Sequence, residues 1–97
     1  MKNEIIAECC NLFDIHPRDL VGPTRFGFLM PARFAMYKAL ASRGWAYAQI
    51  GAFLNRDRTT VRHGITRAEY MARRDPDYAD KVQHLIDFQP PYLESQT

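Results

Sequence analysis

The residues best suited to chemistry lie near the middle of the chain, in a stretch rich in arginine and threonine. Arg58 and Arg62 are four positions apart, so on a helix they would share one outward face. Thr59, His63 and Thr66 lie beside them on that face. A guanidinium group offers a fork of donors that fits phosphate oxygens and the O6 and N7 edge of guanine. These residue types at this spacing predict contact with an anionic partner such as nucleic acid.

Two helical segments joined by a tight turn are needed to position this face. Residues 46–54 have the periodicity of a short helix, and residues 58–73 that of a longer one. Asn55 tolerates the left-handed backbone of a tight turn, and Asp57 is a favourable N-cap for the second helix. This arrangement is the helix-turn-helix pattern, whose second helix enters the major groove. The apolar positions expected in the core are Ile50, Phe53 and Leu54 on the first helix and Val61, Ile65 and Ala68 on the second.

An amphipathic helix with a merely solvated polar face is the alternative interpretation. A solvated face usually mixes Glu and Lys, which pair with each other. Around the start of the 58–73 helix, the single acid Asp57 stands against four arginines, which are Arg56, Arg58, Arg62 and Arg67. The free N–H groups at the helix N-terminus add a partial positive charge that suits a phosphate. The excess of arginine favours the nucleic-acid interpretation.

Charge is unevenly distributed along the chain. Residues 18–74 hold 11 Lys and Arg residues, ten of them Arg, against three acids, which is a net charge of +8. Residues 1–17 carry −2 and residues 75–97 carry −4, so the formal net charge is only +2. A basic centre between acidic ends indicates an anionic partner for one face of the molecule.

The remaining periodic segments are also helical, at residues 4–13, 17–21, 26–43 and 76–88. Pro31 conflicts with a helix interior, so we expect the long third segment to begin near Thr24 or Met30, with Pro31 in or near its first turn. Its expected apolar stripe comprises Phe26, Leu29, Met30, Arg33, Met36, Tyr37 and Leu40. No segment alternates as a strand would. The predicted fold class is all-α, with five to six helices in a single domain over residues 1–97 and a frayed tail at residues 89–97.

Three segments resemble one known family. The run IGAFLNRDRTTVRHGI, Ile50–Ile65, is similar to the signature of the C-terminal DNA-binding domain of the bacterial replication initiator DnaA. Pro31–Leu40 resembles the Arg-x-x-Ala-Met-Tyr helix of that domain, and Asp19–Arg25 resembles its loop ending in a basic residue. The resemblance covers roughly residues 4–88 in order. It implies a helix-turn-helix fold of the Trp-repressor and DnaA C-terminal kind.

The resemblance also implies roles for individual residues. Arg25 would insert into the minor groove, where a narrow A·T tract concentrates negative potential. Asp57, Thr59 and Thr60 would stand at the edge of the major groove, and Arg56 would hold a phosphate or brace the turn. The full set of predicted DNA-binding residues is Arg25, Arg56, Asp57, Arg58, Thr59, Thr60 and Arg62. Arg33 and Arg43 are weaker candidates, for which a solvated helix position is the favoured interpretation.

The sequence departs from the family signature at the centre of this site. Arg58 stands where the signature has His, and a guanidinium favours guanine where the imidazole made a base contact. Arg62 replaces a usually apolar residue, and Leu54-Asn55 replaces a glycine-rich turn. We therefore expect a target sequence that resembles a DnaA box without necessarily matching it.

Several function classes are disfavoured. There is no GxxxxGK[ST] phosphate loop for an ATPase, and His16, His63 and His84 are too scattered for a catalytic or metal site. Adjacent Cys9 and Cys10 indicate reduced thiols rather than a disulfide. No apolar run is long enough for a membrane span, and the N-terminus does not resemble a signal peptide. We expect no enzyme activity, cofactor or small-molecule substrate, and a cytoplasmic protein associated with the nucleoid.

Two functions remain open on the sequence alone. The first is a regulator that binds double-stranded DNA at DnaA-box-like sites and modulates replication initiation or transcription. The second is a protein adaptor that keeps the fold and acts on a DnaA-type AAA+ replication regulator. Arg25, Asp57, Thr59 and Thr60 favour the first, whereas the acidic helix expected at residues 76–88 leaves room for the second.

Overall fold

The computed structural model describes residues 2–89, and side chains from residue 4 onward. The elements in order are α1 (Lys2–Phe13), α2 (Pro17–Val21), the 3-10 turn η1 (Gly27–Leu29), α3 (Met30–Ser42), α4 (Tyr47–Leu54), α5 (Arg58–Arg74) and α6 (Pro76–Asp87). This confirms the all-α class and the expected helices, and residues 2–89 contain no strand. The frayed tail expected at residues 89–97 lies, from residue 90 onward, outside the described residues.

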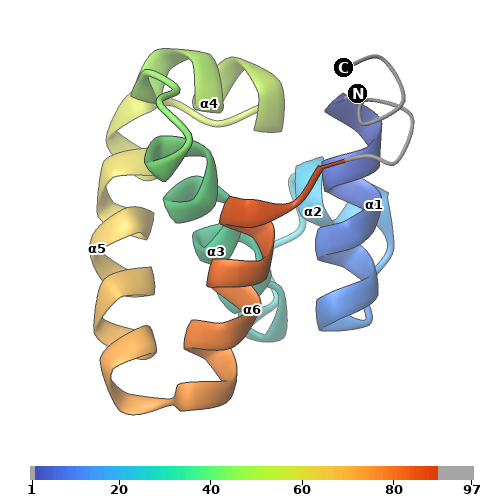
Figure 1. Ribbon diagram of the computed structural model, residues 1–97. Helices are drawn as coiled ribbons and strands as arrows, with labels where there is room; N and C mark the ends of the chain where they lie inside the picture. The colour runs from blue at the N-terminus through green and yellow to red at the C-terminus, as the bar shows by residue number, and fades with distance from the viewer. Residues whose placement is uncertain (1, 90–97) are drawn as a thin grey trace.

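Helix α3 is the centre of the molecule. It packs against α5, α6, α4 and α1, which surround it in Figure 1. Three alanines on α3, Ala32, Ala35 and Ala39, are buried, and their small side chains let neighbouring helices approach closely. The largest buried apolar side chains of this helix are Met36, Tyr37 and Leu40. A core built around one helix fixes the positions of all the others.

The start of α3 follows from its proline. The helix begins at Met30, so Pro31 occupies the first turn, where its missing N–H removes no helical hydrogen bond. This confirms the predicted start near Met30. Phe26, which the sequence placed on the apolar stripe of this helix, lies outside it in extended backbone and is exposed. That expectation was wrong because the helical periodicity does not extend upstream of the proline turn.

Helices α4 and α5 form the predicted helix-turn-helix unit (Figure 1). Asn55 adopts the expected left-handed conformation, with φ 60° and ψ 49°. Gly51 is required just before the turn, because a Cβ there would lie 2.3 Å from the carbonyl oxygen of Arg56. Asp57 caps α5 as predicted, its Oδ1 accepting a 2.7 Å hydrogen bond from the backbone N–H of Thr60. Local sequence chemistry therefore accounts for the whole turn.

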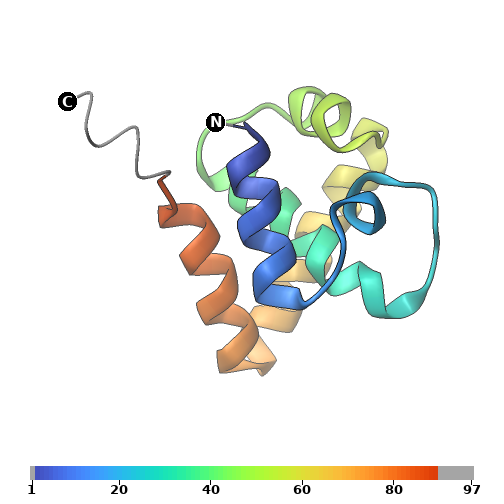
Figure 2. The same ribbon diagram turned by 90° about the vertical axis from the view of Figure 1, so that its right-hand side faces the viewer.

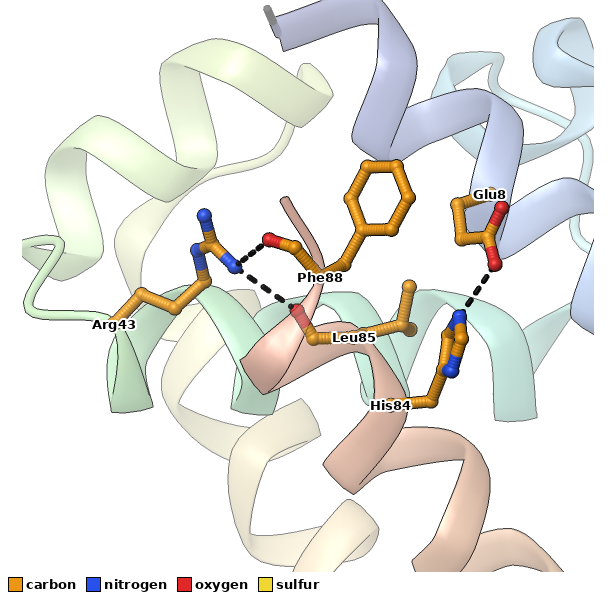
Figure 3. A network of polar contacts seen from close by, with 5 residues as sticks. All are labelled: Glu8, Arg43, His84, Leu85 and Phe88. Carbon is orange, nitrogen blue, oxygen red and sulfur yellow. Dashed lines mark hydrogen bonds and ion pairs between the residues drawn. The ribbon is translucent and has the colours of Figure 1, made fainter. Parts of the chain in front are cut away.

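Helix α6 is held in place by polar contacts from distant parts of the chain. Tyr78 Oη donates a 2.7 Å hydrogen bond to the carbonyl oxygen of Pro31. Arg43 Nη1 donates to the carbonyl oxygens of Leu85 and Phe88 at 3.3 and 2.7 Å, as Figure 3 shows. The same view shows Glu8 of α1 in contact with His84 of α6. The sequence-based interpretation of Arg43 as a solvated residue was wrong, since its guanidinium caps the end of α6.

Two further features bear on the sequence predictions. Cys9 and Cys10 are free thiols and both are buried, as expected for reduced cysteines on a helix. Among the helices that the structure describes, none combines the length and the apolar character that crossing a membrane requires.

Candidate nucleic-acid interface

A groove of about 610 Å³ brings together the loop after α2, the first half of α3 and the turn before α5. Its lining residues are Pro23, Arg25, Met30, Arg33, Phe34, Tyr37, Asn55, Arg56, Asp57 and Thr60. Arg25 and the N-terminus of α5, which the sequence predicted to serve one site from distant positions, therefore line the same groove. The loop that carries Arg25 projects at the edge of the molecule opposite α6, as Figure 2 shows.

Helix α5 presents a polar face to solvent beside this groove. Its buried side consists of Val61, Gly64, Ile65 and Ala68. The predicted contact residues Arg58, Thr59, Thr60 and Arg62 are all exposed, as are His63 and Thr66. Exposed guanidinium and hydroxyl groups on one helix face can reach phosphates and base edges. The residues of the predicted face are thus exposed to solvent on the side of α5 that does not face the core.

Asp57 lines the groove and caps the N-terminus of α5. The hydrogen bond that its carboxylate accepts from the backbone N–H of Thr60 lowers the pKa of Asp57 below its ordinary value. The carboxylate is therefore ionised at neutral pH, where a negative charge at a helix N-terminus is favourable. Thr59 and Thr60 follow in the first turn and are exposed, and Thr60 also lines the groove.

Arg56 braces the turn, which is one of the two roles expected for it. Its Nη1 donates to the carbonyl oxygens of Leu54 and Asn55, at 3.1 and 2.9 Å, within the turn itself. Its guanidinium also reaches α2, donating to the carbonyl oxygens of Val21 at 3.2 Å and Gly22 at 2.5 Å. Arg56 thereby joins the helix-turn-helix unit to the loop that carries Arg25.

Arg33 completes this attachment from inside the molecule. The side chain is 3% exposed, so the preferred interpretation of a solvated residue was wrong. Its Nη2 donates to the carbonyl oxygens of Asp19 at 2.6 Å and Gly22 at 3.2 Å. Burial lowers the pKa of Arg33 from its ordinary value, with nearby Arg56 contributing in the same direction. A signal was present in the sequence, because Arg33 occupies an apolar-stripe position three residues from both Met30 and Met36.

Arg33 and Arg56 together form what we call the arginine clamp. The last carbonyl groups of a helix lack helical partners and carry partial negative charge, so cations stabilise them. The clamp supplies two cations to the end of α2 and so fixes the loop from Gly22 onward. The loop holds Arg25 exposed beside the groove.

Sequence reasoning missed one feature of this loop. Phe26 and Phe28 are 61% and 69% exposed, and their rings stack with centroids 5.7 Å apart at an interplanar angle of 13°. Phe26 follows Arg25 directly in the chain, and Phe28 comes two residues later. A pair of aromatic residues separated by one glycine, just before a proline turn, is the signal that could have placed them outside the helix.

The arrangement offers cations, hydroxyl groups and backbone N–H donors. Within residues 2–89 no cluster of three or more His, Cys, Asp or Glu side chains could hold a metal ion. These groups suit the binding of an extended anion, with backbone phosphates and base edges as partners.

Comparison with known proteins agrees with this geometry. The family model for the bacterial DnaA helix-turn-helix matches residues 3–68. The chain is 36% identical over 86 residues to the chromosomal replication initiator protein DnaA of Ruegeria pomeroyi, which covers 84% of this chain and 18% of that protein. It is 34% identical over 73 residues to the DnaA of Thermomicrobium roseum, covering 73% and 16%. The chain spans less than a fifth of the length of the relatives it matches.

Proposed function

Since the chain belongs to the bacterial DnaA helix-turn-helix family, we propose that its DNA-binding domain reads double-stranded DNA at DnaA-box-like sites. The observation that carries the proposal is the groove lined by both Arg25 and the start of α5. In this docking, α5 lies in the major groove and Arg25 enters the adjacent minor groove. A narrow A·T-rich minor groove has enhanced negative potential and favours an inserted arginine.

The first turn of α5 supplies the direct base contacts in this proposal. Thr59 can place its methyl group against a thymine methyl, and Thr60 can donate its hydroxyl to a phosphate or base edge. The Asp57 oxygen outside the cap can accept from a cytosine amino group. Arg58, which stands where the family signature has His, reads guanine through O6 and N7. The preferred DNA site therefore has a G·C pair at the position that Arg58 contacts. Arg62 adds a phosphate or guanine contact one turn further along the face.

In this proposal the biological activity of the domain is to occupy DnaA-box-like sites on DNA. A domain that binds boxes used by a replication initiator competes for them, which modulates replication initiation or transcription. The proposal includes no ATPase activity, because the 97 residues contain no GxxxxGK[ST] motif. It places the protein in the cytoplasm on nucleoid DNA.

Fluorescence polarisation tests box reading directly. A labelled duplex carrying a DnaA box is compared with a scrambled duplex of equal composition at near-physiological salt. We expect a preference for the box of about a hundredfold or more, since specific sites are usually bound about 10³–10⁷ times more tightly than non-specific DNA. Equal and salt-sensitive binding to both duplexes would contradict box reading while leaving DNA binding intact. Absence of binding to either duplex would overturn the proposal.

Single substitutions test the docking itself. Arg25→Ala and Thr60→Ala should each weaken binding to the specific duplex by about 1–3 kcal/mol. Arg67→Ala is the control, because Arg67 is also exposed on α5 but lies further from the groove. This control should cost less, and equally on specific and scrambled duplexes. Unchanged binding by both Arg25→Ala and Thr60→Ala would rule out the proposed docking.

Helix α6 supports a second candidate function. Helix α6 lies at the edge opposite the Arg25 loop (Figure 2), and its acids Asp77, Asp80 and Asp87 are exposed. An acidic helix there could bind a basic surface of a DnaA-type AAA+ protein without covering the groove. Calorimetric titration with such a protein, using Asp77→Asn/Asp80→Asn as the variant, tests this. Equal affinity of the variant and the natural chain would exclude α6 as the contact.

A further inference from the structure

The stacked pair of Phe26 and Phe28 comprises the two most exposed large hydrophobic residues in the part of the chain that the structure describes. Both rings are more than 60% exposed, whereas Leu29, the next residue, is fully buried. Leu29 therefore anchors the segment and leaves the two rings projecting from it. Exposure of two neighbouring phenyl rings to water is unfavourable, and no contact within the fold offsets it. Exposed apolar groups of this kind mark interaction sites.

The surroundings of the pair indicate an anionic partner. Arg25 immediately precedes Phe26, and the chain contains no acidic residue between Asp19 and Asp57. The loop thus carries a cation at Arg25, directly before the two exposed apolar rings. A protein surface able to cover two phenyl rings would be mainly apolar, and it would leave Arg25 unpaired. DNA satisfies both groups, since the minor groove has charged walls and its base steps have apolar faces.

The loop is also held in one position. The arginine clamp binds the carbonyl oxygens of Asp19, Val21 and Gly22 directly upstream. Leu29 holds the downstream end in the core. A segment tied at both ends presents its side chains in a fixed place, which reduces the entropy lost on binding.

We infer that Phe26 and Phe28 form an apolar wedge that enters the minor groove beside Arg25 and partly unstacks a base step there. Inserted apolar side chains of this kind open a step and bend the duplex toward the major groove. The inference rests on the proposed function and adds to it a deformation of the target, so flexible pyrimidine–purine steps next to the box become part of the preferred sequence.

Two spectroscopic readouts on one duplex test the wedge. The duplex carries a DnaA box with an A·T-rich flank, a donor and an acceptor dye at its ends, and 2-aminopurine at the flanking step. The full chain should raise energy transfer between the ends and raise 2-aminopurine fluorescence, because the duplex bends and the step unstacks. Phe26→Ser/Phe28→Ser should lose both signals and bind roughly tenfold or more weakly.

Two further variants serve as controls. Phe26→Leu/Phe28→Leu keeps an apolar wedge and should retain most of the bend. Tyr70→Ser removes an aromatic ring of similar exposure, 47%, from α5 outside the groove and should change neither signal. Circular dichroism of each variant checks that the helices are intact.

The outcomes separate the two proposals. Natural protein that binds the duplex without bending it overturns the wedge and leaves box reading in place. The wedge is likewise overturned if the serine variant bends and binds as the natural chain does, a result that would assign the pair to a protein partner. No binding by the natural chain in the polarisation assay overturns both.

Discussion

Gly64 illustrates how the absence of a side chain at one position allows the recognition helix to lie where it does. A Cβ at this position would lie 2.3 Å from Cδ2 of Tyr37 and 2.9 Å from Cδ1 of Phe34. Tyr37 is 2% exposed, so its ring has no room to move away. Glycine at position 64 thus has a packing reason in this chain, since α5 contacts the ring of Tyr37 there.

Gly64→Ala should therefore destabilise the protein although alanine favours helix. Overpacking costs about 1–3 kcal/mol, and the 2.3 Å approach to a buried ring places this site in the upper part of that range. The better helix propensity returns about 1 kcal/mol, so we expect a net loss of roughly 1–2 kcal/mol. Urea denaturation measures this. Gly27→Ala is the control, since no atom lies within 4 Å of a Cβ placed there. Equal stability of Gly64→Ala and the natural chain would contradict the packing described.

Asp57 gives a pH dependence whose sign follows from its pKa. The folded state lowers the pKa of Asp57 through the hydrogen bond from Thr60. Its contribution to stability is therefore present above the unfolded-state pKa of about 3.9 and is lost as pH falls through the folded-state value. Asp57→Asn keeps an accepting oxygen that does not titrate.

We expect acidification to reduce the amide-exchange protection at the start of α5 in the natural chain more than in Asp57→Asn. Exchange of the Thr60 amide followed by NMR between neutral pH and about pH 3, corrected for intrinsic rates, measures the difference. A parallel decline in both proteins would mean that the cap contributes no pH dependence.

At the scale of elements, the arginine clamp connects α2 to the helix-turn-helix unit. Arg56→Met keeps the aliphatic stem but removes the side-chain donor of the Val21 carbonyl oxygen and leaves that of Gly22 with only the 3.2 Å bond from Arg33, which should cost about 1–3 kcal/mol. Because the clamp holds the loop of Arg25, box affinity should fall as well. Denaturation and polarisation measure the two effects.

Arg18→Met is the matched control for the clamp. Arg18 lies exposed on α2 and its loss removes the same charge. If Arg18→Met lowers stability and box affinity as much as Arg56→Met does, overall charge rather than the clamp is responsible.

The elements divide into those that short-range signals predict and those that only the assembled fold determines. The N-cap at Asp57, the left-handed Asn55 and the proline turn at Pro31 each follow from the chemistry of one residue and its neighbours. The roles of Arg33 and Arg43 could not be predicted in the same way, because their acceptors lie on other helices. Periodicity placed Arg33 on the buried face, but composition argued that arginine belongs in water.

At the scale of the whole molecule, the partition of charge predicts how binding responds to salt. The exposed arginines on the loop and on the first ten residues of α5 are Arg25, Arg58, Arg62 and Arg67. If each neutralises one phosphate, log K against log salt should fall with a slope of about −3 to −4. Polarisation between low and physiological salt measures it, and Arg67→Ala should reduce the slope by about 1. A slope near zero would contradict phosphate contacts by this face.

The contact between Arg43 and the end of α6 also sets an order of events during translation. Arg43 and its acceptor on Phe88 are separated by 45 residues, which a ribosome adds in about 2–9 s at roughly 5–20 residues per second. Helix α3 precedes Arg43 in the chain, and α4 and α5 are added within that interval, while the face of α3 that α6 will cover is still bare. A nascent chain thus completes its recognition helix before α6 closes the core, and for those seconds the buried alanines and Met36 of α3 lack part of their cover.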